Sequence, residues 1–150
     1  MRKMIKRLSY LLASLCAFVA GFMMFLSPVS SVIEIGSLSQ VTEIPWNEVY
    51  FPESGNGTVY PFVAFLALIA VGLVLFFLVF FPRISRILEI PCVAIIALAI
   101  GVLCCTNGLY VVSKIASINA TITNGPAITY GVSLAAVSLL FTFIGSVIKR

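Results

Sequence analysis

The sequence predicts an all-α integral membrane protein, a bundle of four transmembrane helices that forms one membrane domain over residues 1–150. The first observation is composition, since 61% of the residues are apolar, 9% are charged and none is histidine. Soluble domains average about 45–50% apolar and about 25% charged residues. The second observation is patterning, because the apolar residues fall into four long runs. A chain with so little polar surface needs lipid as its solvent.

Each of the four runs is long enough to cross the hydrocarbon core, which takes about 20 residues. We expect helices over residues 8–29, 59–81, 91–115 and 127–148. The first ends near Pro28, and the third begins at Pro91, because proline suits the first turn of a helix. The basic start of the first run also resembles a secretory signal peptide. Its apolar part exceeds the usual 7–15 residues, so we expect a helix that is not cleaved.

The basic residues predict the orientation. Eight of the nine lysines and arginines precede the first span, separate the second from the third, or follow the fourth: Arg2, Lys3, Lys6, Arg7, Arg83, Arg86, Lys149 and Arg150. By the positive-inside rule this side is the cytoplasm, so both termini are cytoplasmic and residues 30–58 form an outer loop of about thirty residues. Basic residues at the ends of apolar runs, rather than on one face, do not favour binding to nucleic acid.

Small residues at four-residue spacing predict close helix packing, which replaces the hydrophobic effect as the source of association in lipid. Such residues recur in the first, third and fourth spans and favour a compact bundle. The predicted packing positions are Ala13, Ala17, Gly21, Gly101, Asn107, Gly108, Gly131, Ser138 and Thr142. The second span is rich in phenylalanine, and we expect it to face lipid or a partner.

Few polar groups fall within the spans. Glu89 and Lys114 lie at opposite ends of the third span, where they would act as interfacial anchors. This distribution argues against a proton-coupled carrier, which needs ionisable groups inside the membrane. Asn107 must find a hydrogen-bond partner in hydrocarbon, and we expect it to join helices. The alternative is that Asn107 and Thr106 line a path for a substrate or an ion.

No pattern in the sequence predicts catalysis, a metal or a cofactor. The commonest general base is absent because there is no histidine. The chain lacks a nucleophile elbow and a glycine-rich phosphate loop. Its four cysteines lie outside the two outer loops, and two of them are adjacent, which does not make a metal pair on a helix. We therefore expect a protein that is not an enzyme.

The outer loop combines aromatic, β-branched and acidic residues. We expect two short extended segments separated at residues 36–39, followed by a turn at residues 52–57. Its aromatic residues suit the membrane–water interface. The alternative is a small lid over the bundle that presents Glu43, Glu48 and Glu53 to a partner protein or a cation. The residues predicted to bind a partner are Trp46, Glu48, Tyr50 and Glu53. Two glycosylation sequons, at Asn56 and Asn119, fall in the two outer loops and matter only in a eukaryotic secretory pathway.

Four spans, cytoplasmic termini and a long first outer loop resemble the tetraspan plan of claudins in topology. Claudins carry a tryptophan-glycine-leucine-tryptophan motif and two cysteines in that loop, whereas this chain has Trp46 alone. The resemblance therefore implies no site residues. We expect an accessory or scaffold subunit in the cell membrane that contacts the bilayer and another membrane protein. The alternative is a small transporter or channel that works through self-association.

Overall fold

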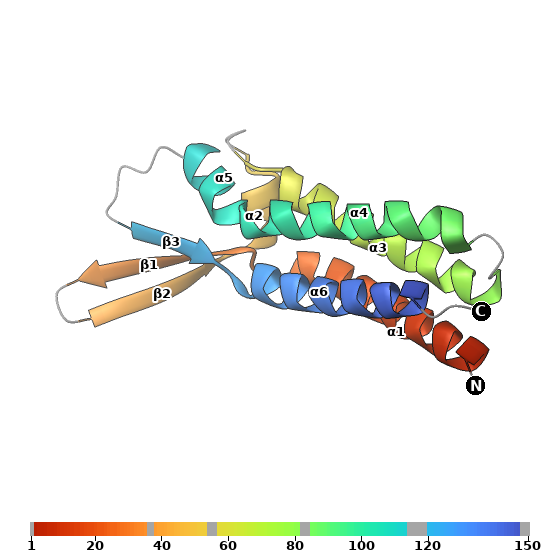
Figure 1. Ribbon diagram of the computed structural model, residues 1–150. Coiled ribbons are helices and arrows are strands. Elements are labelled where there is room, and N and C mark those ends of the chain that lie inside the picture. The colour runs from red at the N-terminus through yellow and green to blue at the C-terminus, as the bar shows by residue number, and fades with distance from the viewer. Residues whose placement is uncertain (1, 36–37, 54–56, 82–84, 114–119, 148–150) are drawn as a thin grey trace.

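A computed structural model of the chain describes residues 2–35, 38–53, 57–81, 85–113 and 120–147. Its main body consists of four long helices that lie side by side (Figure 1). They are α1 (Arg2–Phe22), α3 (Tyr60–Phe80), α4 (Ser85–Cys104) and α6 (Pro126–Val147). Each is long and apolar enough to cross a membrane, α1 together with the turn that follows it. The predicted four-helix architecture is confirmed at this level.

α1 and α4 lie on opposite sides of the bundle, and both contact the same two helices. α1 packs against α3 and α6, and α4 packs against α3 and α6 on the other side. The buried face of α1 is small, because Ala13, Ala17 and Ala20 have no exposed surface. Large side chains lie against small residues where α1 meets α3: Ile69 lies against Gly21, and Phe18 lies against Gly72. This pairing of small with large residues gives the close packing that helices in lipid require.

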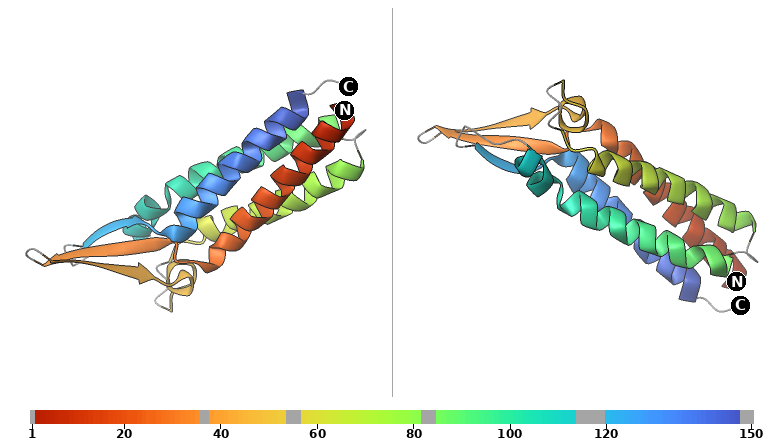
Figure 2. Two further views of the ribbon diagram at one scale, coloured as in Figure 1. Left: turned by 90° about the horizontal axis from the view of Figure 1, so that it is seen from below. Right: turned by 90° about the horizontal axis from the view of Figure 1, so that it is seen from above.

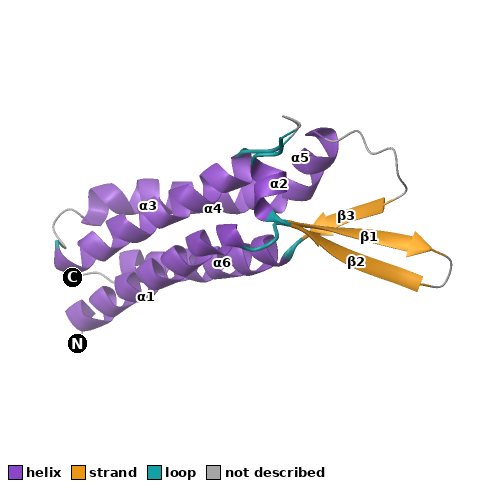
Figure 3. Ribbon diagram, turned by 180° about the vertical axis from the view of Figure 1, so that it is seen from behind, coloured by secondary structure: helices purple, strands orange, loops and turns teal. Residues whose placement is uncertain are grey.

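A three-stranded antiparallel sheet extends beyond one end of the bundle (Figures 2 and 3). Its strands are β1 (Val29–Ile35), β2 (Leu38–Ile44) and β3 (Ala120–Asn124), in the order β2-β1-β3. Val29 pairs with Ile44 on one side and with Asn124 on the other. The two extended segments expected in the first outer loop are confirmed. The third strand, from the second outer loop, was not anticipated.

Two short helices lie next to the strands in the sequence. The 3₁₀ helix η1 (Met23–Phe25) continues α1 before β1, and α2 (Trp46–Tyr50) follows β2. Pro45 lies at the N-cap of α2 in an extended conformation, and its carbonyl accepts the Glu48 amide at 3.1 Å. Half of the turn expected at residues 52–57, residues 54–56, lies outside the described ranges.

The junction between bundle and sheet depends on a close crossing of two segments. The Gly125 amide donates to the Pro28 carbonyl at 2.9 Å, and the Ala127 amide donates to the Ser27 carbonyl at 3.1 Å. A Cβ atom on Gly125 would lie against the Ser27 carbonyl and 2.8 Å from the Val29 amide nitrogen. The two chain segments approach so closely that only glycine fits at this position.

The first helix differs from its predicted bounds. α1 begins at Arg2 and gives way to η1 after Phe22, whereas the expected helix covered residues 8–29. Its early start follows from the helix propensity of lysine and arginine. Its early end follows from the pairing of β1, which already includes Val29.

The third predicted span is divided into two helices. α4 begins at Ser85, so Pro91 lies inside the helix and not at its first turn. α4 ends at Cys104, and α5 (Thr106–Ser113) follows. The Cys105 amide is shared between the Gly101 and Val102 carbonyls, both at 3.2 Å. The Thr106 hydroxyl also donates to the Val102 carbonyl at 3.4 Å, a contact that bends helices. Residues 114 and 115 of the predicted span lie outside the described ranges.

Candidate functional site

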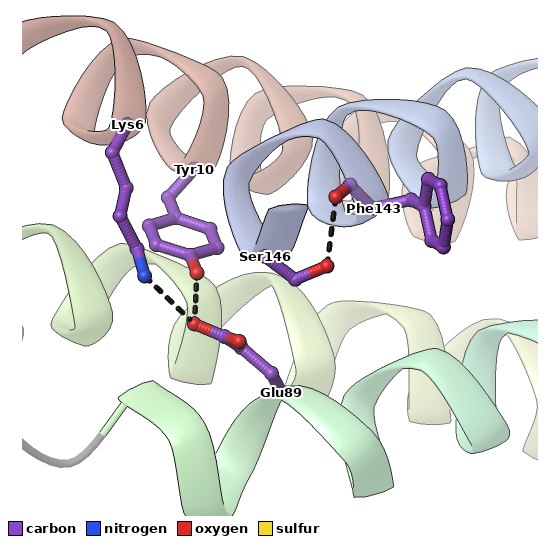
Figure 4. Close-up of polar contacts among 5 residues, drawn as sticks. All are labelled: Lys6, Tyr10, Glu89, Phe143 and Ser146. Carbon is purple, nitrogen blue, oxygen red and sulfur yellow. Dashed lines mark hydrogen bonds and ion pairs between the residues drawn. The ribbon is translucent and has the colours of Figure 1, made fainter. Parts of the chain in front are cut away.

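A buried carboxylate lies between the first and third long helices (Figure 4). Glu89 on α4 is 7% exposed, and its Oε1 lies 3.3 Å from the Lys6 Nζ. The Tyr10 hydroxyl donates a hydrogen bond to the same oxygen. Lys6 and Tyr10 are one turn apart on α1, so both reach the same face of the helix. The ammonium also lies 5.4 Å from the centroid of the Tyr10 ring, within range of a cation–π contact.

A third helix closes this cluster from the side of α6. Tyr10 is 1% exposed, and a Cβ atom on Gly145 would lie 2.8 Å from its ring carbon Cε1. Gly145 therefore leaves the space that the tyrosine ring occupies. Cys92 is also buried and follows Glu89 by one turn on α4. The carboxylate is thus enclosed by helices and balanced by an ammonium and a hydroxyl, as a buried charge requires.

The expectation that Glu89 is an interfacial anchor is wrong, because its side chain points into the bundle. Its partners are too distant in sequence for any local pattern to indicate them. The cluster offers a paired carboxylate rather than a free acid or base. Within the described ranges, no three histidine, cysteine or acidic side chains are placed so as to hold a metal ion. Lys114, the other expected anchor, lies outside those ranges.

The small and polar residues predicted for packing on α1 and α6 lie inside the bundle. The Ser138 hydroxyl donates to the Ala13 carbonyl at 2.8 Å, and the Thr142 hydroxyl donates to the Ser138 carbonyl at 2.8 Å. The Ser14 hydroxyl donates to the Gly72 carbonyl on α3 at 2.9 Å. These bonds give the buried hydroxyls of Ser14, Ser138 and Thr142 a partner, and two of them join α1 to its neighbours α3 and α6.

Two predicted packing glycines on these helices lie against large side chains. A Cβ atom on Gly21 would meet Ile69, and one on Gly131 would lie 2.7 Å from a ring carbon of Phe65. Ala13 and Ala17 have no exposed surface. All four positions therefore contribute to contacts between helices.

The small residues predicted on α4 and α5 face outward instead. A Cβ atom on Gly101 or Gly108 would meet nothing within 4 Å. The buried face of α4 is formed by Cys92, Ile96 and Ala99 together with Leu103. Gly101 and Gly108 thus do not pack within this bundle, contrary to expectation. Small residues do recur at helical spacing on this segment, but α4 packs against its neighbours through a different face.

Asn107 makes a local contact rather than a bond between helices. Its Oδ1 accepts the Gly108 amide at 2.8 Å. Its neighbour Thr106 has no exposed surface and bonds back to Val102 in the preceding turn. Among the described residues, the hydrogen bonds of Thr106 and Asn107 remain within α4 and α5, and the expected interhelical bond of Asn107 is not among them.

The four residues predicted to bind a partner separate into two groups. Glu48 and Glu53 are exposed, whereas Trp46 is half-buried and packs edge-to-face on Phe25, with ring centroids 5.8 Å apart. Tyr50 is 1% exposed and packs against Phe62 at 5.6 Å. The prediction that Tyr50 is a surface contact is wrong, because this side chain belongs to the hydrophobic core.

Tyr50 has an unusual environment for a phenol. Its hydroxyl is buried without a hydrogen-bond partner in the part of the chain that the structure describes. Burial raises the pKa of Tyr50 well above its usual value, because the phenolate would lose its hydration. The nearby Thr58 hydroxyl is likewise buried and unpartnered, while the Thr58 amide donates to the Val49 carbonyl at 2.9 Å.

An apolar groove lies between α3 and α4. It has a volume of about 260 Å³ and is lined by Tyr60, Val63, Ala64, Ala67, Ile95, Leu98, Ala99 and Val102. Binding sites for small molecules usually combine an apolar wall with a few placed polar groups. This groove has an almost wholly apolar wall, so it offers little to orient a polar substrate.

Comparison with known proteins gives no relative: no family model, no curated protein and no solved structure matches the chain. The function must therefore be argued from the residues and their arrangement.

Proposed function

We propose that the chain is a multi-pass protein of the cell membrane with both termini in the cytoplasm. Four helices of sufficient length and hydropathy support the insertion. The orientation rests on the basic residues, eight of which precede, separate or follow the spans on one side. The sheet and α2 then lie outside the cell.

Within that membrane we propose a non-enzymatic accessory or scaffold subunit that acts by contact with another membrane protein. The observation that carries this proposal is the sheet. Both outer segments contribute strands to it, and it extends beyond the helices (Figure 2). A structure of this kind is more than a connection between spans requires, since helix connections in bundles typically take about 2–8 residues.

The exposed residues of this outer end have the composition of a contact surface. Val41, on the edge strand β2, is 63% exposed, and Phe51 after α2 is also exposed. Glu43, Glu48 and Glu53 are exposed carboxylates on the same segments of the chain. Apolar side chains rimmed by charges are typical of surfaces that bind proteins. We expect a partner with basic groups at the contact.

Co-purification tests this proposal. We would extract the tagged full chain from its native membrane in mild detergent and identify the proteins that accompany it by mass spectrometry. A stoichiometric membrane protein that is lost from the Glu48→Lys/Glu53→Lys variant supports the proposal. Lys3→Glu/Arg7→Glu serves as a control with equally large charge changes at the other end of the bundle. If neither variant changes the set of accompanying proteins, the outer surface is not the contact.

The break between α4 and α5 supports a second candidate, a small homo-oligomeric transporter or channel. Helices interrupted within the membrane often line transport paths. Here Thr106 and Asn107 lie directly after the break at Cys105. Asn107→Leu should then abolish flux into liposomes. Intact flux in that variant would exclude Asn107 from the path.

A further inference from the structure

Most of the basic residues belong to the segments that border one end of the bundle. The chain termini lie together at this end, where α3 ends and α4 begins (Figures 1 and 2). The basic residues of these segments are Arg2, Lys3, Lys6, Arg7, Arg83, Arg86, Lys149 and Arg150. Of the five glutamates in the chain, Glu89 alone belongs to the same segments. Of these residues, Lys3, Lys6 and Arg7 on the first turns of α1 have described side chains, and Arg83, Lys149 and Arg150 lie outside the described ranges.

Among the described residues of this end, the acidic side chain is Glu89, and it is already paired. Glu89 lies 3.3 Å from Lys6 and accepts the Tyr10 hydroxyl, and it is buried. Lys3 and Arg7 are exposed on the same helix, and in the described part of the chain no acidic side chain pairs with them. The surplus of cations at this end is a property of the folded bundle and would attract anions.

Exposed apolar side chains occur among these cations. Met4 is 71% exposed and Leu8 is 52% exposed, next to Lys3 and Arg7 on α1. Phe80 and Phe81 at the end of α3 are also exposed, shortly before Arg83. A surface that combines cations with apolar side chains matches the boundary between lipid headgroups and acyl chains. A nucleic acid or a soluble anion would gain nothing from the apolar part.

We infer that this basic end binds the headgroups of anionic phospholipids. The inference rests on the membrane insertion proposed above, but not on the identity of any partner protein. Basic clusters next to a span bind anionic lipid with a free energy of about 1 kcal/mol per lysine or arginine near the surface. Lys3 and Arg7 are the positions best placed for this contact, because their side chains are exposed and Glu89 is satisfied by Lys6.

Lipid retention tests the inference. The full chain, purified in mild detergent, is mixed with equal amounts of phosphatidylglycerol and phosphatidylcholine, and the bound lipids are counted by native mass spectrometry. We expect phosphatidylglycerol to be retained several-fold over phosphatidylcholine. In Lys3→Gln/Arg7→Gln, retention of phosphatidylglycerol should fall about fivefold for each cation removed. Equal retention of the two lipids by the unaltered chain would overturn the inference.

Two control variants separate headgroup binding from general charge effects. Lys6→Gln/Glu89→Gln removes the buried pair without changing the net charge, so it should retain lipid as the unaltered chain does. Lys114→Gln removes the basic residue that follows α5 and should have no effect. Lys114→Gln removes one cation. If it lowers the retention of phosphatidylglycerol as much as each cation removed in Lys3→Gln/Arg7→Gln does, the inference is contradicted. The co-purification assay reads the opposite end of the bundle, so failure of one proposal leaves the other intact.

Discussion

Lys6 on α1 and Glu89 on α4 form an ion pair of 3.3 Å between two helices that otherwise pack mainly against α3 and α6. Tyr10 adds a hydroxyl to the same carboxylate oxygen. The cluster therefore joins the first helix to the third span at the end of the bundle where the termini lie. Because the carboxylate is buried, its partners matter more than those of a surface ion pair.

Removal of one partner should destabilise the bundle. Lys6→Met leaves Glu89 buried without its cation, and we expect a loss of about 1–3 kcal/mol in the free energy of unfolding, below the value for a fully buried pair because Lys6 is 15% exposed. Lys6→Met/Glu89→Met should recover most of this loss, since no unpaired charge remains. Thermal unfolding in detergent measures both. Equal stability of Lys6→Met and the unaltered chain would show that the pair adds nothing.

Two glycines on neighbouring helices should respond in opposite ways to the same substitution. Gly131→Ala places a methyl group 2.7 Å from the Phe65 ring, so we expect a loss of about 1–3 kcal/mol from overpacking. Gly101→Ala meets nothing within 4 Å and should be neutral, or stabilising by up to about 1 kcal/mol through helix propensity. The unfolding temperatures of the two variants in the same detergent provide the comparison. A larger loss for Gly101→Ala would place that face inside a contact.

Two serines of α6 offer a similar comparison for hydrogen bonding. The buried Ser138 donates to the Ala13 carbonyl on α1, whereas the exposed Ser133 donates to the Thr129 carbonyl of its own helix, both at 2.8 Å. Ser138→Ala should cost about 0.6 kcal/mol, the average for such bonds between membrane helices. Ser133→Ala should cost less. Equal effects on the free energy of unfolding would argue against a specific contribution from the bond between helices.

The buried hydroxyl of Tyr50 should make the stability depend on alkaline pH. Burial raises the pKa of Tyr50 in the folded state, so the unfolded chain releases this proton first, from about pH 10. Stability is then present below that pH and falls as the pH rises above it. Tyr50→Phe removes this dependence and the unpartnered hydroxyl, so it should not destabilise the protein at neutral pH. Unfolding curves of both proteins between pH 8 and about pH 11 provide the test; identical slopes would contradict it.

The long helices were predictable because hydropathy and length specify them locally. The face that each helix buries was harder to predict from the sequence. Ala13 and Ser138 lie inside, as their spacing indicated, but Gly101 and Gly108 face outward on α4 and α5. Small residues permit a close contact between helices, but their spacing does not indicate which neighbour makes that contact. Spacing alone therefore cannot predict which face of the helix is buried.

The sheet and the buried pair required information from distant parts of the chain. β3 contains the alternating stretch Ala120–Asn124, but its place beside β1 depends on how α6 begins. Glu89 could not be distinguished from an interfacial anchor, because Lys6 and Tyr10 become its neighbours only when α1 packs near α4. Tyr50 looked like an interface residue from its type, and only the packing of Phe62 shows that it is buried.

Photo-crosslinking from the sheet tests the proposed contact with a partner most directly. A photoreactive amino acid replaces Val41, which is 63% exposed on β2, and the control chain carries it at Leu98, which is 71% exposed on α4. After irradiation in native membranes, a specific membrane protein should be attached at position 41 in high yield and be absent or weak at position 98. Attachment of no protein at position 41, or of the same proteins at both positions, would contradict a function by contact through the outer sheet.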